Sequence, residues 1–232
     1  MKKYQIVIPN WNQSELCIKC LQSIKKYSTN YEVIFVDNGS EVSEFKKILQ
    51  VLKTMPHKAI LNKSNLGFVK ATNQGLALCD SEYIVLMNND TEAVDGWLEK
   101  LSKPLIENSN CVISGGLTTT RDSWQGCYVP KNDLPYIILP KPRMVAFFCT
   151  MFSKKVFDTI GFLDEGFGVG FGDDDDFCMR TQKHGFDIAL VQNVRIPHHH
   201  RSTFKKIYRQ NTIKDMQTKA LQKFKNKHGV FS

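Results

Sequence analysis

Four consecutive aspartates, Asp173–Asp176, lie between Gly172 and Phe177 in the second half of the chain. Such a charge run is commonly a solvated loop, and this one lacks the alternating ligands, spaced glycine and distal glutamate of a calcium loop. A third interpretation is general base catalysis, because the N-terminus of a following helix favours a charged carboxylate while acidic neighbours raise its pKa. The flanking Phe171 and Phe177 indicate partial enclosure, which favours a functional role.

A second group of residues could hold a divalent cation. Asp90 follows Asn88 and Asn89 directly after an apolar run. A strand-tip carboxylate can bind the cation that neutralises a nucleoside diphosphate, although an aspartate there can equally be a turn residue or helix cap. Three histidines, His198–His200, follow a strand-like segment. Adjacent residues of an extended chain point to opposite faces, so a tri-histidine zinc site is disfavoured. One imidazole could complete a Mn²⁺ or Mg²⁺ site at Asp90, and a polar surface turn is the alternative.

Asp37 also follows an apolar run and admits two interpretations. It could cap the next helix, or it could accept the ring N–H of a uracil or thymine. The chain has no GxxxxGK[ST] motif, and the glycines of "GFGVGFG" alternate by two, unlike a GxGxxG loop after a first strand. These patterns exclude a P-loop ATPase and an NAD enzyme.

The elements that position these side chains alternate between strands and helices. Strands are predicted at 4–9, 32–36, 58–61 and 83–87, and helices at 15–27, 42–52 and 69–79. This order predicts βαβ units and a parallel sheet, in which ligands bind beyond the carboxyl ends of the strands. The second half adds an apolar segment at 144–152, helices at 154–160 and from the aspartates toward His184, and a strand-like 194–197.

Length and composition predict one large globular unit. The chain has 232 residues, of which 42% are hydrophobic. We expect a single domain at 1–203, with a nucleotide-binding half (1–116) and a second-substrate half (117–203), and a tail at 204–232. The longest apolar run, 144–152, is shorter than the roughly 20 residues of a membrane span, and Pro9 interrupts the first one. A cytoplasmic location follows as an expectation.

The net charge of +8 is concentrated in the tail, since residues 201–232 hold nine Lys or Arg and one acidic residue. The tail is predicted to form a basic amphipathic helix that packs partly on the domain and contacts an anionic inner membrane surface or acceptor. A solvated helix face is the alternative, and nucleic acid binding is disfavoured because only the tail suggests it. Among seven scattered cysteines, Cys17 and Cys20 share a helical spacing with Leu21 and Ile24, which predicts core packing.

Seven motifs in order resemble the inverting glycosyltransferases of family 2, which have the GT-A fold and include rhamnosyltransferases. They are "VIPNWN", "VDNGS", "NLGFVKATNQGL", "YIVLMNNDTEAVDGWL", "VFDTIGFLDEGF", "FGDDDDFCMR" and "VRIPHHH", and they span residues 3 to about 203. The aspartate run also resembles the GWGxEDDD motif of galactosyltransferases. The resemblance implies an α/β fold, a nucleotide-sugar donor, a Mn²⁺ or Mg²⁺ cofactor, and a glycan, lipid-linked or protein acceptor.

The resemblance also implies roles for individual residues. Alignment on Arg180 places Asp174 at the catalytic base and Asp173 at the preceding Glu, while Asp175 and Asp176 are alternatives because the register of four aspartates can shift by one. The metal ligands are Asp90 and His198, with Asn88 replacing the first acid of the family's DxD motif. The implied nucleotide and donor residues are Pro9, Asn10, Asn12, Asp37, Asn65, Gly67, Phe68, Asn73, Asn88 and Asn89.

The predicted reaction is transfer of a sugar from a UDP- or dTDP-sugar to an acceptor hydroxyl, in surface polysaccharide or glycoconjugate synthesis. A carboxylate deprotonates the hydroxyl and a cation stabilises the leaving diphosphate. Two alternatives are a non-catalytic nucleotide-sugar-binding module and a sugar-phosphate nucleotidyltransferase. The second usually has a glycine-rich basic loop after the first strand, whereas "PNWNQSE" has neither glycine nor lysine.

Overall fold

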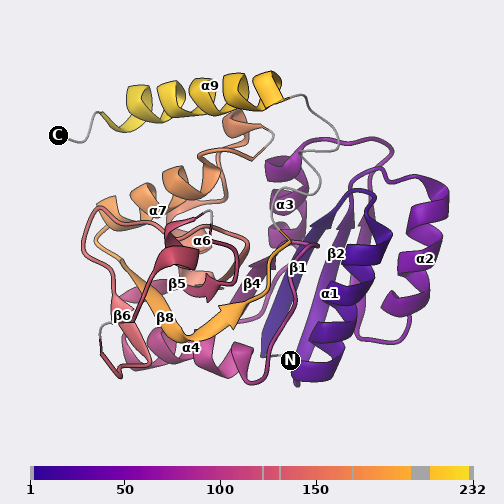
Figure 1. The fold of residues 1–232 in the computed structure, drawn as a ribbon, viewed down its shortest axis with the longest axis horizontal. Coiled ribbons are helices and arrows are strands. Elements are labelled where there is room, and N and C mark those ends of the chain that lie inside the picture. The colour runs from indigo at the N-terminus through magenta and orange to yellow at the C-terminus, as the bar shows by residue number, and fades with distance from the viewer. Residues whose placement is uncertain (1–2, 122, 131, 169, 200–209, 230–232) are drawn as a thin grey trace.

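The computed structural model describes residues 3–121, 123–130, 132–168, 170–199 and 210–229 (Figure 1). The strands are β1 (Tyr4–Asn10), β2 (Tyr31–Asp37), β3 (His57–Leu61), β4 (Tyr83–Met87), β5 (Cys111–Thr118), β6 (Tyr136–Ile138), β7 (Cys149–Ser153) and β8 (Asp187–Ile196). The helices are α1 (Ser14–Tyr27), α2 (Val42–Leu52), α3 (Phe68–Ala77), α4 (Trp97–Glu107), α5 (Trp124–Cys127), α6 (Lys154–Ile160), the 3₁₀ helix η1 (Glu165–Phe167), α7 (Asp173–Lys183) and α9 (Gln210–His228).

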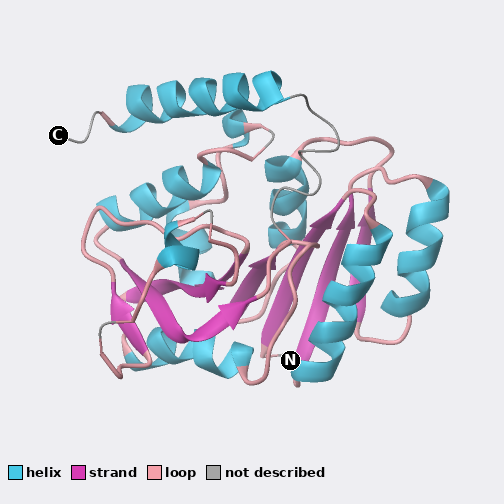
Figure 2. Ribbon diagram, viewed as in Figure 1, coloured by secondary structure: helices cyan, strands magenta, loops and turns pink. Residues whose placement is uncertain are grey.

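Within these residues the strands form one eight-stranded sheet in the order β3-β2-β1-β4-β7-β5-β8-β6 (Figure 2). The first four strands pair in parallel, and helices α1, α2 and α3 connect them, as the alternating pattern predicts. Strand β7 is antiparallel to both β4 and β5, and β6 is an antiparallel edge strand. The fold class is therefore α/β with a mostly parallel sheet, as predicted from the sequence.

Two apolar clusters cover the two faces of the sheet. Ile6 and Ile8 of β1 pack in a cluster with residues of α1, α2 and α4, whereas Val7 packs with α3, α6 and α7. This alternation follows from the period of two in a strand. Cys17 and Cys20 are fully buried in the first cluster, so the prediction that both thiols face the core is confirmed.

The elements missing from the sequence prediction lie in the middle of the chain. Helix α4 contains Pro104 and follows Gly96, and strand β6 has only three residues, so both carry weak local signals. The apolar segment 144–152 forms a strand only from Cys149 onward. Because Leu117 lies within β5, the predicted boundary between the two halves falls inside a strand of the common sheet.

Helix α9 lies across the outside of α7 (Figure 1). Its buried residues are Ile213 and Phe224, and the latter joins the same apolar cluster as α7. Most of its remaining described side chains are polar and exposed. Among the described residues, no helix has the length and apolar character needed to cross a membrane.

Candidate active site

A cavity of about 430 Å³ opens at the carboxyl ends of β1, β2 and β4 and extends to the start of α7. It brings together residues that are far apart in the sequence. Of the predicted site residues, its walls contain Pro9, Asn10, Asn65, Gly67, Phe68, Asn88, Asn89, Asp90, Asp173, Asp174, Asp175 and His198. Asn12, Asp37, Asn73 and Asp176 are not part of these walls.

Asn10 connects the tips of three strands at one end of the cavity. Its Nδ2 atom donates a hydrogen bond to Asp37 Oδ1 (3.3 Å), and its Oδ1 atom accepts one from Asn89 Nδ2 (2.7 Å). The other carboxylate oxygen of Asp37 accepts from the backbone N–H of Ser40 (3.1 Å). Asp37 is only 5% exposed. Its carboxylate therefore lies behind the wall and orients the amide of Asn10.

Asn38 is a wall residue to which the sequence analysis assigned no role. Its Nδ2 donates to Asn65 Oδ1 (2.9 Å) and to Gly67 O (3.2 Å), and its Oδ1 accepts from Leu66 N (3.0 Å). One side chain thus holds the loop after β3 against the end of β2. The signal available in the sequence was its place directly after a strand, beside Asp37.

The turn after β2 needs a glycine at position 39. Gly39 has a φ of +80°, and a Cβ there would lie 2.6 Å from the backbone of Ser64. Asn12 stabilises the same turn from the loop after β1. Its N–H donates to Ser40 Oγ (2.7 Å), and its Oδ1 accepts from Glu41 N (2.8 Å). Asn12 therefore supports the cavity without lining it.

Asn73 lies in α3 and contacts another part of the molecule. Its Nδ2 donates to Leu163 O (2.9 Å), and its Oδ1 accepts from Leu163 N (3.1 Å). Both ends of the amide are engaged by the segment that leads into η1. The structure thus gives Asn73 a tethering role between α3 and this segment, and its contact with a donor stays a prediction.

Asp90 and His198 lie side by side in the cavity wall. Asp90 Oδ1 is 3.3 Å from His198 Nε2, and each side chain is less than a tenth exposed. The imidazole of His198 stacks on Phe148, with ring centroids 5.2 Å apart. His199 points elsewhere, since its Nε2 lies 3.0 Å from Glu92 Oε1, and His200 is outside the described residues. The opposed directions of His198 and His199 agree with the alternation expected of an extended chain.

These residues suit a divalent cation that shares its coordination with a ligand. Asn88 also lines the cavity, and its Oδ1 atom is buried without a hydrogen-bond partner. The wall thus offers one carboxylate, one imidazole and one amide oxygen, donors that match Mn²⁺ or Mg²⁺. Among the described residues, no three His, Cys, Asp or Glu side chains cluster as a complete metal site. Further ligands would come from diphosphate oxygens and water.

At the opposite end, α7 begins with the aspartate run. Gly172 precedes the helix with a φ of +77°, so the chain turns sharply and presents Asp173, Asp174 and Asp175 to the cavity. Burial raises the pKa of Asp173 to about 7, with the charges of Asp175 and Asp176 acting in the same direction. Burial and the carboxylates of Asp175 and Asp173 raise the pKa of Asp174 well above its usual value.

Asp176 has a different environment, although it belongs to the same run. Its side chain is fully buried and contacts Arg180 Nε (2.9 Å), Lys227 Nζ (2.8 Å) and His228 Nε2 (2.7 Å). Burial acts to raise the pKa of Asp176, but hydrogen bonds from Lys227, His228 and Arg180 outweigh it and lower the pKa. Asp176 is thus engaged by three cationic partners and lies outside the cavity walls, which disfavours it as the alternative base.

Several wall residues carried no assigned role in the sequence analysis. Besides Asn38, they are Trp11, Ser123, Ala146, Phe147, Phe148, Gly170, Phe171, Gly172 and Gln217. Phe147 and Phe148 belong to the apolar segment 144–152 and precede β7, and Gln217 comes from the tail helix. Their contribution depends on tertiary packing, which leaves no local motif.

Comparison with known proteins agrees with this geometry. Residues 5–161, more than half of the chain, match the family described as Glycosyl transferase family 2. The chain belongs to glycosyl transferase family 2. The membership of family 2 predicted from the motifs is therefore confirmed.

Among the relatives of this chain is the dTDP-rhamnosyl transferase RfbF of Shigella flexneri, which is 26% identical over 182 residues, or 73% of this chain. The chain spans 60% of the length of that relative, and 37% and 35% of the two that follow it in similarity.

Solved structures show the same fold at low sequence identity. The mannosyltransferase PcManGT of Pyrobaculum calidifontis, in complex with GDP-Man and Mn²⁺, aligns with a TM-score of 0.70 and 15% identity over 87% of this chain and 58% of its own. GalNAc-T7 with UDP, GalNAc and Mn²⁺ aligns with a TM-score of 0.71 over 85% of this chain and 44% of its own. Both are GT-A fold enzymes, so the predicted GT-A fold is confirmed.

Proposed function

We propose that this glycosyltransferase is a metal-dependent, inverting enzyme that moves a sugar from a UDP- or dTDP-sugar to an acceptor hydroxyl. One observation carries the proposal: the Asp90–His198 pair and the carboxylates Asp173–Asp175 line the same cavity. The first group is suited to the diphosphate and the second to the acceptor hydroxyl. Residues 1–116 then bind the nucleotide sugar and residues 117–203 bind the acceptor.

Asp174 is the proposed general base. An acceptor hydroxyl is a weak nucleophile at neutral pH and needs a carboxylate within hydrogen-bond reach to take its proton. Asp174 lines the cavity, and its raised pKa makes its carboxylate a stronger base than an exposed aspartate. One base acting on the acceptor supports a single displacement, which inverts the anomeric carbon.

Asp90 and His198 would hold the divalent cation, with Asn88 beside them. A bound Mn²⁺ or Mg²⁺ supplies positive charge to the leaving diphosphate. Phe148 fixes the plane of the His198 ring by stacking, so the imidazole is oriented before any ligand binds. The Mn²⁺ in the complexes of PcManGT and GalNAc-T7 supports this assignment.

The favoured donor is a nucleotide sugar whose base is a pyrimidine. The dTDP-sugar specificity in the name of RfbF supports it, as does the amide-rich end of the cavity around Asn10 and Asn38. Asp37 acts by holding Asn10, because both of its carboxylate oxygens accept hydrogen bonds from within the protein. The acceptor is a glycan, a lipid-linked sugar or a protein.

The tail supports a peripheral location at the cytoplasmic face of a membrane. The side chains of Lys214 and Lys225 are exposed on α9, and the apolar Leu221, seven residues after the first and four before the second, is 55% exposed. Cationic and apolar side chains on one exposed helix surface favour anionic lipid.

A donor screen tests the proposal. The purified protein with Mn²⁺ is incubated with UDP-, dTDP-, GDP- and ADP-sugars, and thermal shift and diphosphate release are measured for each. We expect stabilisation and release with a UDP- or dTDP-sugar, loss of both with EDTA, and loss of the base preference in Asp37→Ala. Equal thermal shifts with all four nucleotide sugars would contradict the preference for a pyrimidine base. Absence of diphosphate release with every donor would contradict the proposed reaction.

A further inference from the structure

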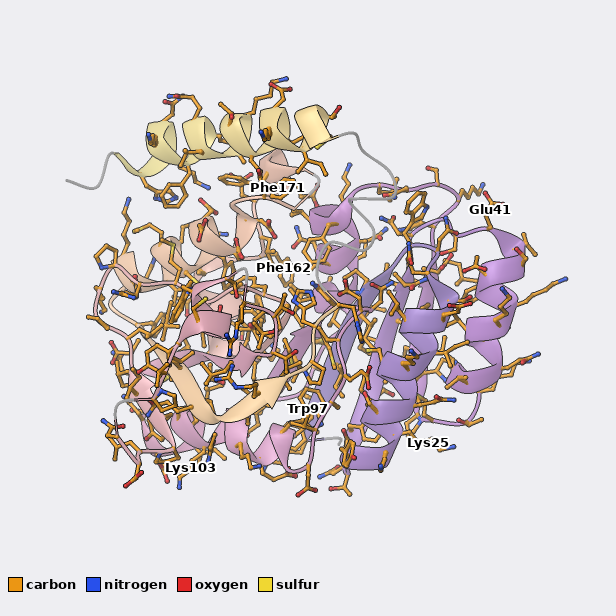
Figure 3. All side chains as sticks on the ribbon, in the orientation of Figure 1. Lys25, Glu41, Trp97, Lys103, Phe162 and Phe171 are labelled. Carbon is orange, nitrogen blue, oxygen red and sulfur yellow. The ribbon has the colours of Figure 1, made fainter. Side chains whose placement is uncertain are left out.

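Helix α9 contributes a side chain to the catalytic cavity. Gln217 is half-buried and lines the cavity together with Gly172 and Asp173–Asp175. One turn further along, α9 passes close to the start of α7, since a Cβ at Gly172 would lie 3.8 Å from Ala220 Cβ. In Figure 3, Phe171 lies directly beneath α9. The wall nearest to the aspartates therefore comes partly from the tail.

Ion pairs and apolar contacts fix α9 in this place. Lys227 Nζ lies 2.8 Å from both Asp164 Oδ2 and Asp176 Oδ1, and His228 Nε2 is 2.7 Å from the same Asp176 oxygen. Lys223 Nζ is 4.3 Å from the ring centroid of Phe167. Phe224 is also buried, so the second half of α9 packs against both α7 and η1. A helix held in this way presents Gln217 at a defined position.

The position of Gln217 corresponds to the acceptor side of the reaction. The amides of Asn10 and Asn38 and the Asp90–His198 pair face the nucleotide and its diphosphate, whereas the acceptor hydroxyl must approach the carboxylates of α7. This reasoning rests on the function proposed above. A neutral amide that both donates and accepts hydrogen bonds suits the vicinal hydroxyls of a sugar ring. Aromatic rings such as Phe171 provide an apolar surface for its C–H face.

We infer that Gln217 is an acceptor-specificity residue, which binds the hydroxyls of a glycoside acceptor while Asp174 deprotonates the reacting one. The C-terminal helix is then part of the acceptor site. Gln217 takes no part in donor binding or in hydrolysis of the donor by water, because neither requires an acceptor sugar. The effect of changing it should fall on transfer alone.

The test uses the full chain and four variants. Gln217→Ala removes the amide, and Gln217→Phe fills the space in front of α7. Gln222→Ala and Gln222→Phe are matched controls, because Gln222 lies on the same helix and is exposed, with its Nε2 bonded to Asn226 Oδ1 (2.8 Å). The probes are the donor chosen by the nucleotide-sugar screen, with water or a panel of p-nitrophenyl glycosides as acceptor.

We expect Gln217→Ala to raise the acceptor KM by about 3- to 10-fold, the effect of one neutral hydrogen bond, and Gln217→Phe to raise it further. Donor KM, donor hydrolysis and Tm of Gln217→Ala should match wild type, and both Gln222 variants should transfer normally. Equal behaviour of the Gln217 and Gln222 variants overturns the inference. Donor hydrolysis by wild type without transfer to any glycoside overturns the assigned acceptor class, whereas absence of both reactions contradicts the proposed function itself.

Discussion

The two ends of the catalytic cavity are built from different kinds of polar group. At the carboxyl ends of β1 and β2, Asn10 and Asn38 form hydrogen bonds with neighbouring side chains and backbone, so their amides are oriented without a ligand. At the start of α7, three carboxylates lie close together and their pKa values are raised. The first arrangement is preorganised for binding, whereas the second stores unfavourable electrostatic energy that is useful for proton transfer.

The same contrast occurs between two residues of one helix turn. Asp174 and Asp176 have identical side chains, but the pKa of the first is raised and that of the second is lowered. The difference comes from partners, because only Asp176 contacts Arg180, Lys227 and His228. Proximity in the sequence therefore does not give these carboxylates the same role, and variants at each position can separate them.

The largest effect is expected for Asp174→Asn. Asparagine keeps the size of the side chain but cannot take a proton from the acceptor, so kcat should fall by about 10²- to 10⁴-fold. Nucleotide affinity, measured by calorimetry, should change little, since the nucleotide contacts lie at the other end of the cavity. The matched controls are Asp173→Asn and Asp175→Asn. A larger loss in one of these than in Asp174→Asn would assign the base to that position.

The pH profile of transfer should be the next largest effect. Burial raises the pKa of Asp173 to about 7 and that of the adjoining Asp174 well above its usual value. A base acts only when it is deprotonated, so kcat/KM should fall about tenfold per pH unit on an acid limb that lies above the usual pKa range of an aspartate. Asp173→Asn removes one negative neighbour and should move this limb to lower pH. A profile that stays flat down to pH 5 would falsify the raised pKa.

Asp176→Asn should act mainly on stability. It leaves Arg180, Lys227 and His228 beside a neutral amide, and loss of one partner of a buried ion pair costs roughly 3 kcal/mol. We place the effect at the low end of the usual range because Lys227 is about one-third exposed. The measurement is urea unfolding, with Asp158→Asn as control, since Asp158 forms an exposed pair with Lys154. Equal unfolding midpoints for the two variants would show that Asp176 does not hold α9.

A smaller effect is expected for Asn38→Asp. A carboxylate cannot donate the hydrogen bonds that Asn38 Nδ2 gives to Asn65 Oδ1 and Gly67 O, and each lost bond costs about 1 kcal/mol. The dissociation constant for UDP or dTDP should rise while kcat at saturating donor is largely preserved. Asn226→Asp, on the exposed surface of α9, is the control. Unchanged nucleotide affinity in Asn38→Asp would show that the hydrogen bonds of Asn38 do not contribute to donor binding.

The sequence was informative where local periodicity or a motif coincided with the tertiary role. The parallel strands β1 to β4 could be predicted because apolar runs alternate with amphipathic helices. The place of Asp90 at the cavity could be predicted because it follows the end of β4 by three residues. The pairing of Asp176 with Lys227 and His228 could not be predicted, because it joins residues about 50 positions apart and leaves no local pattern. The same holds for the hydrogen bonds between the amide of Asn73 and Leu163, which are 90 positions apart in the sequence.

The position of β7 has a consequence for synthesis of the protein on the ribosome. Strand β7 pairs with β4 on one side and with β5 on the other, although it follows both in the chain. A nascent chain that has emerged only as far as β5 therefore exposes an unpaired edge of β4. Unpaired strand edges promote association between chains. The first four strands should thus depend on a chaperone, or on rapid elongation, until residue 153 has left the exit tunnel.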